Sequence, residues 1–205
     1  MLDERTTQSD ATLIARVQAG ETPCFDELVR RYQPALARVA RSRLGRADWA
    51  EDVGQETFLA AFKSCGSYDS QFSFRTWLWT ILLNQCHGHY QRRLRSVPLE
   101  PWPIECVPTG ASEQGDETGS PLVHLLAKER SAQLESLLGQ LSTVQADALR
   151  LRFFGGLKFH EIAETMQCSL TSTKNRVRWG LMRMAELLQT AGATGAPPSD
   201  LDQEC

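Results

Sequence analysis

The sequence has no apolar stretch long enough to cross a membrane. Its best apolar run extends from Trp77 to Leu83, far short of the about 20 residues that a spanning helix needs. The first residues are polar and acidic, without the apolar segment of a secretion signal. We therefore expect a cytoplasmic protein with no direct membrane insertion.

Paired cysteines and catalytic motifs are also missing. The six cysteines lie without paired spacing, which is typical of reduced thiols. No HExxH, paired-carboxylate or nucleophile motif is present. Cys86, His87 and His89 are close in sequence, but on a helix the two histidines point about 200° apart and would not share an ion. We expect no catalytic residue, no metal site and no cofactor.

Strand-like alternation is absent from the first half of the chain, where apolar residues recur at helical spacing. The expected helices are 12–19, ended by Gly20; one from Pro23 that Pro34 kinks or restarts; one through Leu36 to Leu44, ended by Gly45; and 49–63. The sequence therefore predicts an all-α fold.

Residues 96–121 contain no Lys or Arg. They hold five acidic residues, several Gly and Ser, and Pro98, Pro101, Pro103, Pro108 and Pro121, a composition unsuited to a helix or a core. We expect a flexible acidic linker between two small helical domains, residues 1–95 and 122–190, with a disordered tail at 191–205.

Both predicted domains are weakly basic. The first has 13 Lys and Arg against 11 Asp and Glu, and the second has 9 against 6. Because neutralisation of phosphates drives most non-specific DNA affinity, this charge alone supports only modest binding. Tight DNA binding is expected to need a protein partner.

Residues 157–179 predict two short helices joined by a tight turn. Ser169 is a suitable N-cap for a second helix that begins at Leu170. Its expected inward positions are Leu170, Thr173, Val177 and Leu181, and its outward positions are Ser172, Lys174, Asn175, Arg178 and Trp179. Lys and Arg suit guanine and Asn suits adenine, so this helix fits a major groove. The alternative is an ordinary solvated charged face.

The helix expected at 49–63 has two distinct sides. Its buried side is expected to hold Val53, Gly54, Thr57, Phe58, Ala61 and Phe62, and its outer side Asp52, Gln55, Glu56 and Leu59. An apolar Leu59 ringed by carboxylates is typical of a protein docking site that attracts basic side chains. A solvated face with one exposed leucine is the alternative.

The next segment is rich in aromatic residues and ends in cations. It contains Tyr68, Phe72, Phe74, Trp77 and Trp79, followed by Tyr90, Arg92, Arg93 and Arg95. Trp77 fits a core stripe, whereas Tyr68 and Phe72 belong to a polar loop. Loop aromatics near an arginine-ended helix suit the stacking of unpaired bases and contact with their phosphates.

As a set, these motifs resemble the extracytoplasmic-function (ECF) sigma factors, the small two-domain specificity subunits of bacterial RNA polymerase. The resemblance rests on residues 50–58, on 74–81 with Asn84 and Arg92-Arg93, and on the helix-turn-helix with 161–163 and 174–176. It implies a non-catalytic subunit that brings core polymerase to promoter DNA. It also implies an anti-sigma partner and a linker that threads the polymerase cleft.

The resemblance assigns three groups of contact residues. Asp52, Gln55 and Glu56, beside Leu59, would bind the coiled-coil clamp of the largest polymerase subunit. Tyr68, Phe72, Trp79, Asn84, Arg92 and Arg93 would contact the minus-ten element, with Tyr68 and Asn84 capturing a flipped base. Lys174, Asn175, Arg178 and Trp179 would read the minus-thirty-five element, and Ser172 and Arg176 would contact its phosphates.

Several positions depart from the usual family pattern. Gly54, Gly88 and Gly180 replace helix formers, and Trp179 stands where a basic residue is frequent. Thr173 occupies a normally aliphatic inward position, so its hydroxyl needs a backbone partner.

Two other functions remain open at this point. One is a stand-alone helix-turn-helix regulator that binds palindromic duplexes without polymerase. The other is a metal-dependent hydrolase that uses Asp, Glu, Cys86 and His87.

Overall fold

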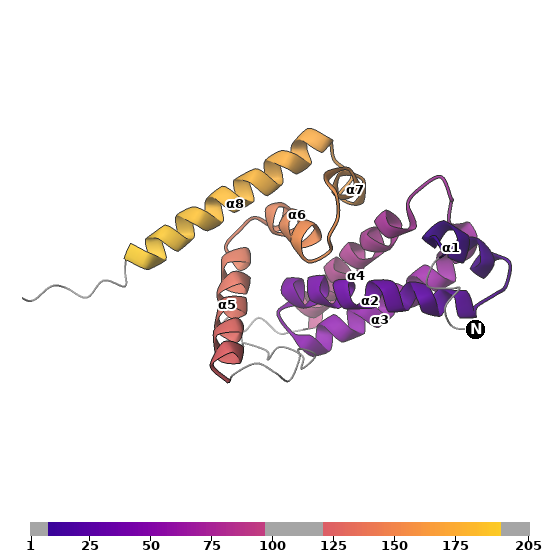
Figure 1. Ribbon diagram of the computed structural model, residues 1–205, viewed down its shortest axis with the longest axis horizontal. Coiled ribbons are helices and arrows are strands. Elements are labelled where there is room, and N and C mark those ends of the chain that lie inside the picture. Colours follow the sequence, from indigo (N-terminus) through magenta and orange to yellow (C-terminus); the bar gives the residue numbers. More distant parts are fainter. Residues whose placement is uncertain (1–7, 97–120, 194–205) are drawn as a thin grey trace, which may run out of the picture.

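The structure is a computed structural model that describes residues 8–96 and 121–193, and within these ranges every regular element is helical (Figure 1). The helices are α1 (Asp10–Gln18), α2 (Pro23–Leu44), α3 (Ala47–Ser64), the short 3-10 turn η1 (Cys65–Ser67), α4 (Phe74–Ser96), α5 (Pro121–Gly139), α6 (Thr143–Phe153), α7 (Phe159–Thr165) and α8 (Leu170–Ala193). The all-α prediction is confirmed. The expected linker and tail lie almost entirely outside the described residues.

Helices α1 to α4 form an N-terminal module in which α2, α3 and α4 pack against one another. Its core includes Leu28, Val53, Leu78 and Leu82, all fully buried. Thr57 joins this core because its hydroxyl donates to the Val53 carbonyl at 2.7 Å. The expected buried face of α3 is therefore largely confirmed.

Two details of the N-terminal module differ from the sequence prediction. Of the two predicted effects of Pro34, a kink or a restart, the restart is wrong, because α2 continues through Pro34 as far as Leu44. Pro34 is exposed, so the backbone carbonyl that loses its helical donor there lies on the solvent side. Phe62 was expected to be buried but is 41% exposed, and its ring contacts Phe25 edge-on at 5.2 Å between centroids.

Helices α5 to α8 form a C-terminal module in which α8 packs on α6 and α7. Ser169 caps α8 as predicted, because its hydroxyl accepts a hydrogen bond from the Ser172 backbone N–H at 3.1 Å. The turn before it includes Gln167, which has a positive φ of 50°. These features give α7 and α8 the expected helix-turn-helix arrangement.

The buried stripe of α8 is shifted from the predicted one. Thr173 and Val177 are buried as expected, but Leu170 and Leu181 are each 44% exposed. The stripe continues through Gly180, where an added Cβ would lie 2.9 Å from Leu149 Cδ1. Close approach of α8 to α6 at this glycine turns Leu181 outward.

The two modules are in direct contact. Helix α4 packs against α7, and α2 packs against α6. Buried side chains of both modules belong to one continuous core. In Figure 1, α6 and α7 accordingly lie alongside the N-terminal module, while α8 extends away from it.

Candidate functional site

The first three turns of α8 present a polar, cationic face to solvent. Lys174, Asn175 and Arg178 are exposed, and Trp179 beside them is 58% exposed. The Ser169 cap fixes where the helix starts and hence which residues lie outward. The face offers two cations and one amide, the groups that read guanine and adenine edges.

The other two residues predicted for this face are more constrained. Arg176 is half-buried, and its Nη1 donates to the Cys168 sulfur at 3.2 Å. The Ser172 hydroxyl accepts from the Ser169 hydroxyl at 2.9 Å. Both side chains therefore lie near the helix start, at the edge of the exposed face.

The buried hydroxyl of Thr173, a residue that departs from the usual family pattern, finds its hydrogen-bond partner at the start of its own helix. Its hydroxyl donates to the Ser169 carbonyl at 3.2 Å and lies 3.3 Å from the Cys168 sulfur. The expectation that a buried threonine here needs a backbone partner is confirmed. No additional polar group is required on α6 or α7 to satisfy it.

On α3 the predicted docking residues do share one surface. Asp52 and Gln55 are exposed, and Leu59 is 57% exposed. Glu56 is tied down, because its carboxylate accepts from Arg92 Nη2 of α4 at 3.0 Å. This ion pair joins the acidic face of α3 to the cationic end of α4.

An open groove of about 1170 Å³ lies beside this face, between α2 and α3. Its lining includes Gln55 and Leu59 together with the apolar Val29, Phe58 and Phe62. The exposed edge of Phe62 thus extends the apolar surface that begins at Leu59. The same groove is also lined by charged residues, among them Arg38 and Arg41. An acidic face that adjoins a groove with exposed apolar side chains suits contact with a protein that carries both charged and apolar side chains.

The residues predicted for unpaired DNA are divided between surface and core. Phe72 is 66% exposed, and Asn84 and Arg92 are also exposed. The side chain of Arg93 lies outside the described part of the structure. Three of the predicted residues are thus placed where nucleic acid could reach them.

Tyr68 and Trp79 lie elsewhere than the sequence led us to expect. Tyr68 is only 8% exposed, its hydroxyl donates to the Phe72 carbonyl, and its ring lies 5.0 Å from that of Trp77. Burial raises the pKa of Tyr68. Trp79 is fully buried in the module core, since it lies on the same inward side of α4 as Leu78 and Leu82. Neither ring is available for stacking in this conformation.

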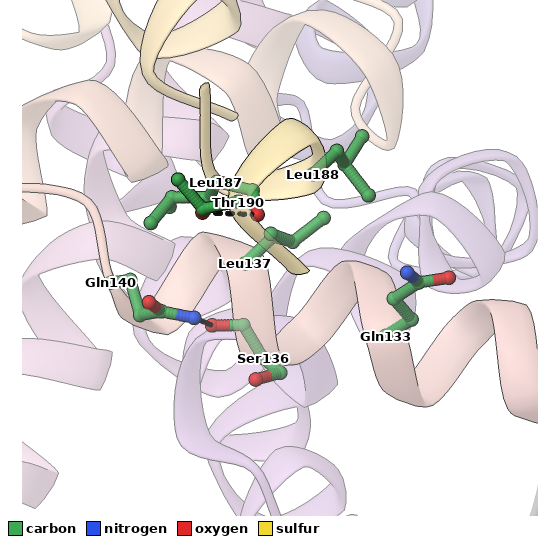
Figure 2. Close-up of a pocket in the computed structure, with 7 residues that line it drawn as sticks. All are labelled: Gln133, Ser136, Leu137, Gln140, Leu187, Leu188 and Thr190. Carbon is green, nitrogen blue, oxygen red and sulfur yellow. Dashed lines mark hydrogen bonds between the residues drawn. The ribbon is translucent and has the colours of Figure 1, made fainter. Parts of the chain in front are cut away.

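A smaller hollow of about 390 Å³ lies between α5 and the end of α8 (Figure 2). Its lining combines Leu137, Leu187 and Leu188 with the neutral polar residues Gln133, Ser136, Gln140 and Thr190. Gln140 Nε2 donates to the Ser136 carbonyl at 3.4 Å, so part of this polarity is satisfied within the chain. None of the described residues that line the hollow is charged, so this lining does not have the character of a phosphate-binding surface.

The described residues contain no cluster of three or more His, Cys, Asp or Glu side chains able to hold a metal ion. Cys86 is buried, and burial raises the pKa of its thiol to about 11, whereas His87 beside it is exposed. These two side chains therefore do not converge. None of the described helices is both long and apolar enough to span a membrane.

One group of charged residues was missed by sequence reasoning. Arg43, Asp147 and Arg150 form a largely buried cluster between α2 and α6, and Arg75 of α4 contacts the loop before α7. The partners that come from different modules are 80 to 104 residues apart in the chain. The i, i+3 spacing of Asp147 and Arg150 was the only local signal, and it is common on exposed helices.

A helical module with an exposed acidic face, followed by a helix-turn-helix module, defines a two-module DNA-binding protein. Residues 28–96 match the family described as sigma-70 region 2, and residues 131–184 match sigma-70 region 4. The RNA polymerase sigma-H factor of Pseudomonas aeruginosa is 31% identical over 176 residues, which cover 84% of this chain and 90% of that protein.

Two further comparisons agree. The ECF RNA polymerase sigma-E factor of Haemophilus influenzae is 28% identical over 82% of this chain and 89% of its own length. The solved structure of CnrH, in complex with the cytosolic domain of CnrY, covers 89% of this chain and 99% of the CnrH chain, with a TM-score of 0.67 and 26% identity. The chain belongs to the sigma-70 family as an ECF sigma factor. Members of this generally non-catalytic family direct RNA polymerase to promoters, and that is the function of this chain.

Proposed function

We propose that the two modules divide promoter recognition between them. The C-terminal module, residues 122–190, reads the duplex minus-thirty-five element, and the N-terminal module, residues 1–95, opens and holds the minus-ten element. The observation that carries this proposal is the exposed face of Lys174, Asn175 and Arg178 at a capped helix start. The acidic segment 96–121 would run through the polymerase cleft between them.

Within the C-terminal module, Lys174, Asn175 and Arg178 would contact base edges in the major groove. Arg176 and Ser172, at the edge of the face, would contact phosphates. Trp179 would pack beside the groove, where its indole adds apolar contact with a thymine methyl rather than a charge.

Within the N-terminal module, Phe72, Asn84 and Arg92 are the described residues best placed for unpaired DNA, and we add Arg93 from sequence alone. Tyr68 would take part only after the loop at residues 66–73 opens, because its hydroxyl and ring are now held within the module. Trp79 would support the base-reading helix from the core and would not touch DNA.

The acidic face of Asp52, Gln55, Glu56 and Leu59 would bind the polymerase core. Its exposed carboxylate and apolar side chain suit a basic, partly apolar helical partner. We further propose an anti-sigma partner, as the family resemblance implies. The similar protein CnrH was itself solved in a complex, with the cytosolic domain of CnrY. The protein would act in the cytoplasm, without a catalytic site, metal or cofactor of its own.

Run-off transcription with purified core polymerase on genomic promoter fragments tests this function. We expect discrete transcripts only when the chain is present. Duplex binding that is unaffected by polymerase, with no stimulation of initiation, would instead favour the stand-alone regulator. Omission of the chain and omission of core polymerase serve as the two controls.

A further inference from the structure

Two separate sets of polar contacts hold the modules together. The first joins the end of α2 to α6. Arg43 Nη1 lies 2.6 Å from Asp147 Oδ2, and the two side chains are only 14% and 7% exposed. Arg150 Nη1 lies 3.3 Å from Asp147 Oδ1, and its Nε donates to the Ser42 hydroxyl at 3.1 Å. One carboxylate is therefore shared by an arginine from each module.

The second set joins α4 to the start of the helix-turn-helix. Arg75 Nη2 donates to the carbonyls of Gly155 and Gly156 at 2.9 and 2.8 Å. Its Nη1 lies 3.8 Å from the Glu161 carboxylate, which also accepts from the Lys158 backbone N–H at the start of α7. Gly156 has a positive φ of 65°, so the loop turns sharply where the guanidinium meets it.

The first set of contacts is buried and forms only when the two modules are packed together. Buried charges are costly unless they are paired, and removal of one partner leaves an uncompensated charge. Separation of the modules would instead return all of these groups to water. The contacts therefore specify how the modules fit together more than they stabilise either module alone.

This arrangement conflicts with simultaneous reading of both promoter elements. Helix α4, which carries Asn84, packs directly against α7 of the helix-turn-helix. Elements centred about 25 base pairs apart are separated by roughly 85 Å along a duplex, at about 34 Å per ten base pairs. In the closed chain the α8 face stays exposed. However, α4 is held against the helix-turn-helix, so the two modules cannot lie roughly 85 Å apart on the DNA.

We propose that these contacts form a two-point latch, made of Arg43–Asp147–Arg150 and of Arg75 with the Gly155–Gly156 carbonyls, which keeps the free chain closed and must release before both elements are bound. This inference rests on the proposed division of promoter reading between the modules. Release is coupled to polymerase binding because only the open chain can contact the enzyme and both elements together.

The test uses two variants of the full chain that break the same pair and change its net charge in opposite directions. Asp147→Ala removes the shared carboxylate, and Arg43→Ala removes its partner while leaving Arg150 to pair with Asp147. Glu186→Ala and Arg183→Ala are matched controls, since these residues form an exposed pair within α8. Arg75→Ala tests the second point separately.

Small-angle X-ray scattering of the free chain should give a larger radius of gyration for Asp147→Ala, Arg43→Ala and Arg75→Ala than for the wild type. Both variants of the shared pair should bind forked DNA that carries both elements roughly five- to tenfold more tightly, the scale of a typical coupling between sites. Binding to a duplex with only the minus-thirty-five element should change no more than in the controls.

Unchanged scattering in all three variants would overturn the latch, as would affinities that simply follow the sign of the charge change in variants and controls alike. If Asp147→Ala loses helical circular dichroism, Arg43→Ala decides the outcome. Failure of the proposed function would appear separately, as no transcription by the wild-type chain with core polymerase, whereas the scattering result would still report on the latch.

Discussion

Arg43 and Asp147, 104 positions apart, form an ion pair of 2.6 Å between α2 and α6. The pair lies at the contact between the two modules, where both side chains are largely buried. Their position makes the relation between the modules a specific feature of the fold rather than a loose association.

The α8 face should determine sequence preference at the minus-thirty-five element. Lys174→Ala and Arg178→Ala should each weaken discrimination by about 1–3 kcal/mol at one base pair, because each removes a contact to a base edge. Binding to duplexes with single base-pair substitutions measures this, and Lys128→Ala on α5 controls for the loss of charge. Footprints identical to wild type in both variants would refute the groove assignment.

The acidic face of α3 should be needed for polymerase association. Asp52→Ala together with Gln55→Ala should abolish co-purification with core enzyme and leave the fold intact, because both side chains are exposed. Circular dichroism checks the fold, and Glu129→Ala, an exposed carboxylate on α5, is the control. Retained association of the double variant would place the docking surface elsewhere.

Two helical glycines should respond oppositely to alanine. Gly88→Ala should stabilise the protein by about 1 kcal/mol through helix propensity, since nothing lies within 4 Å of the added Cβ. Gly180→Ala should destabilise it by about 1–3 kcal/mol, because the Cβ would lie 2.9 Å from Leu149 Cδ1 on the packed face of α6. Urea unfolding of both variants measures the difference. Equal stabilisation would mean that α8 does not approach α6 this closely.

Glu27 should give the protein an acid-sensitive contribution to stability. Hydrogen bonds from Arg30 and Arg31 lower the pKa of this carboxyl to about 2, below its usual value of 4.5. A lowered pKa stabilises the folded state fully above the unfolded value, and that stabilisation is lost as the pH falls from about 4.5 to about 2. At pH 6 the free energy of unfolding should therefore be higher for the wild type than for Glu27→Gln.

The same comparison should show the two proteins converging as the pH approaches 2, since the wild-type carboxyl becomes protonated and loses its advantage. Unfolding in urea at several pH values provides the measurement. A difference that stays constant over this range would show that the charge of Glu27 is not what stabilises the fold.

Much of the local structure was predictable because its causes lie within a few residues of one another. Ser169 caps α8, Gly45 ends α2, and Thr173 satisfies its own hydroxyl on the preceding turn. Each depends on backbone groups three or four positions away, which a sequence pattern records. The outward positions of Lys174 and Asn175 followed from the same helical period.

Other predictions failed where the sequence does not say which side of a helix or loop is buried and the packing of neighbouring helices decides it. Tyr68 lies in a loop of polar composition, which predicts an exposed side chain, yet its ring packs against Trp77 and Phe74. The aromatic residues of this segment point to more than one side of α4, so the sequence alone does not say which of them are buried. Trp79 is buried because neighbouring helices pack on its side of α4. Leu181 is turned outward by the approach of α8 to α6 at Gly180.

The sequence by itself determined the helices, their caps, the helix-turn-helix and the residues that share each exposed face, because these follow from propensity and period. Only the tertiary structure decided that Arg43 meets Asp147 and that Arg75 meets the Gly155 carbonyl. Such contacts depend on where whole helices come to rest, and residues far apart in the chain leave no periodic signal of that meeting.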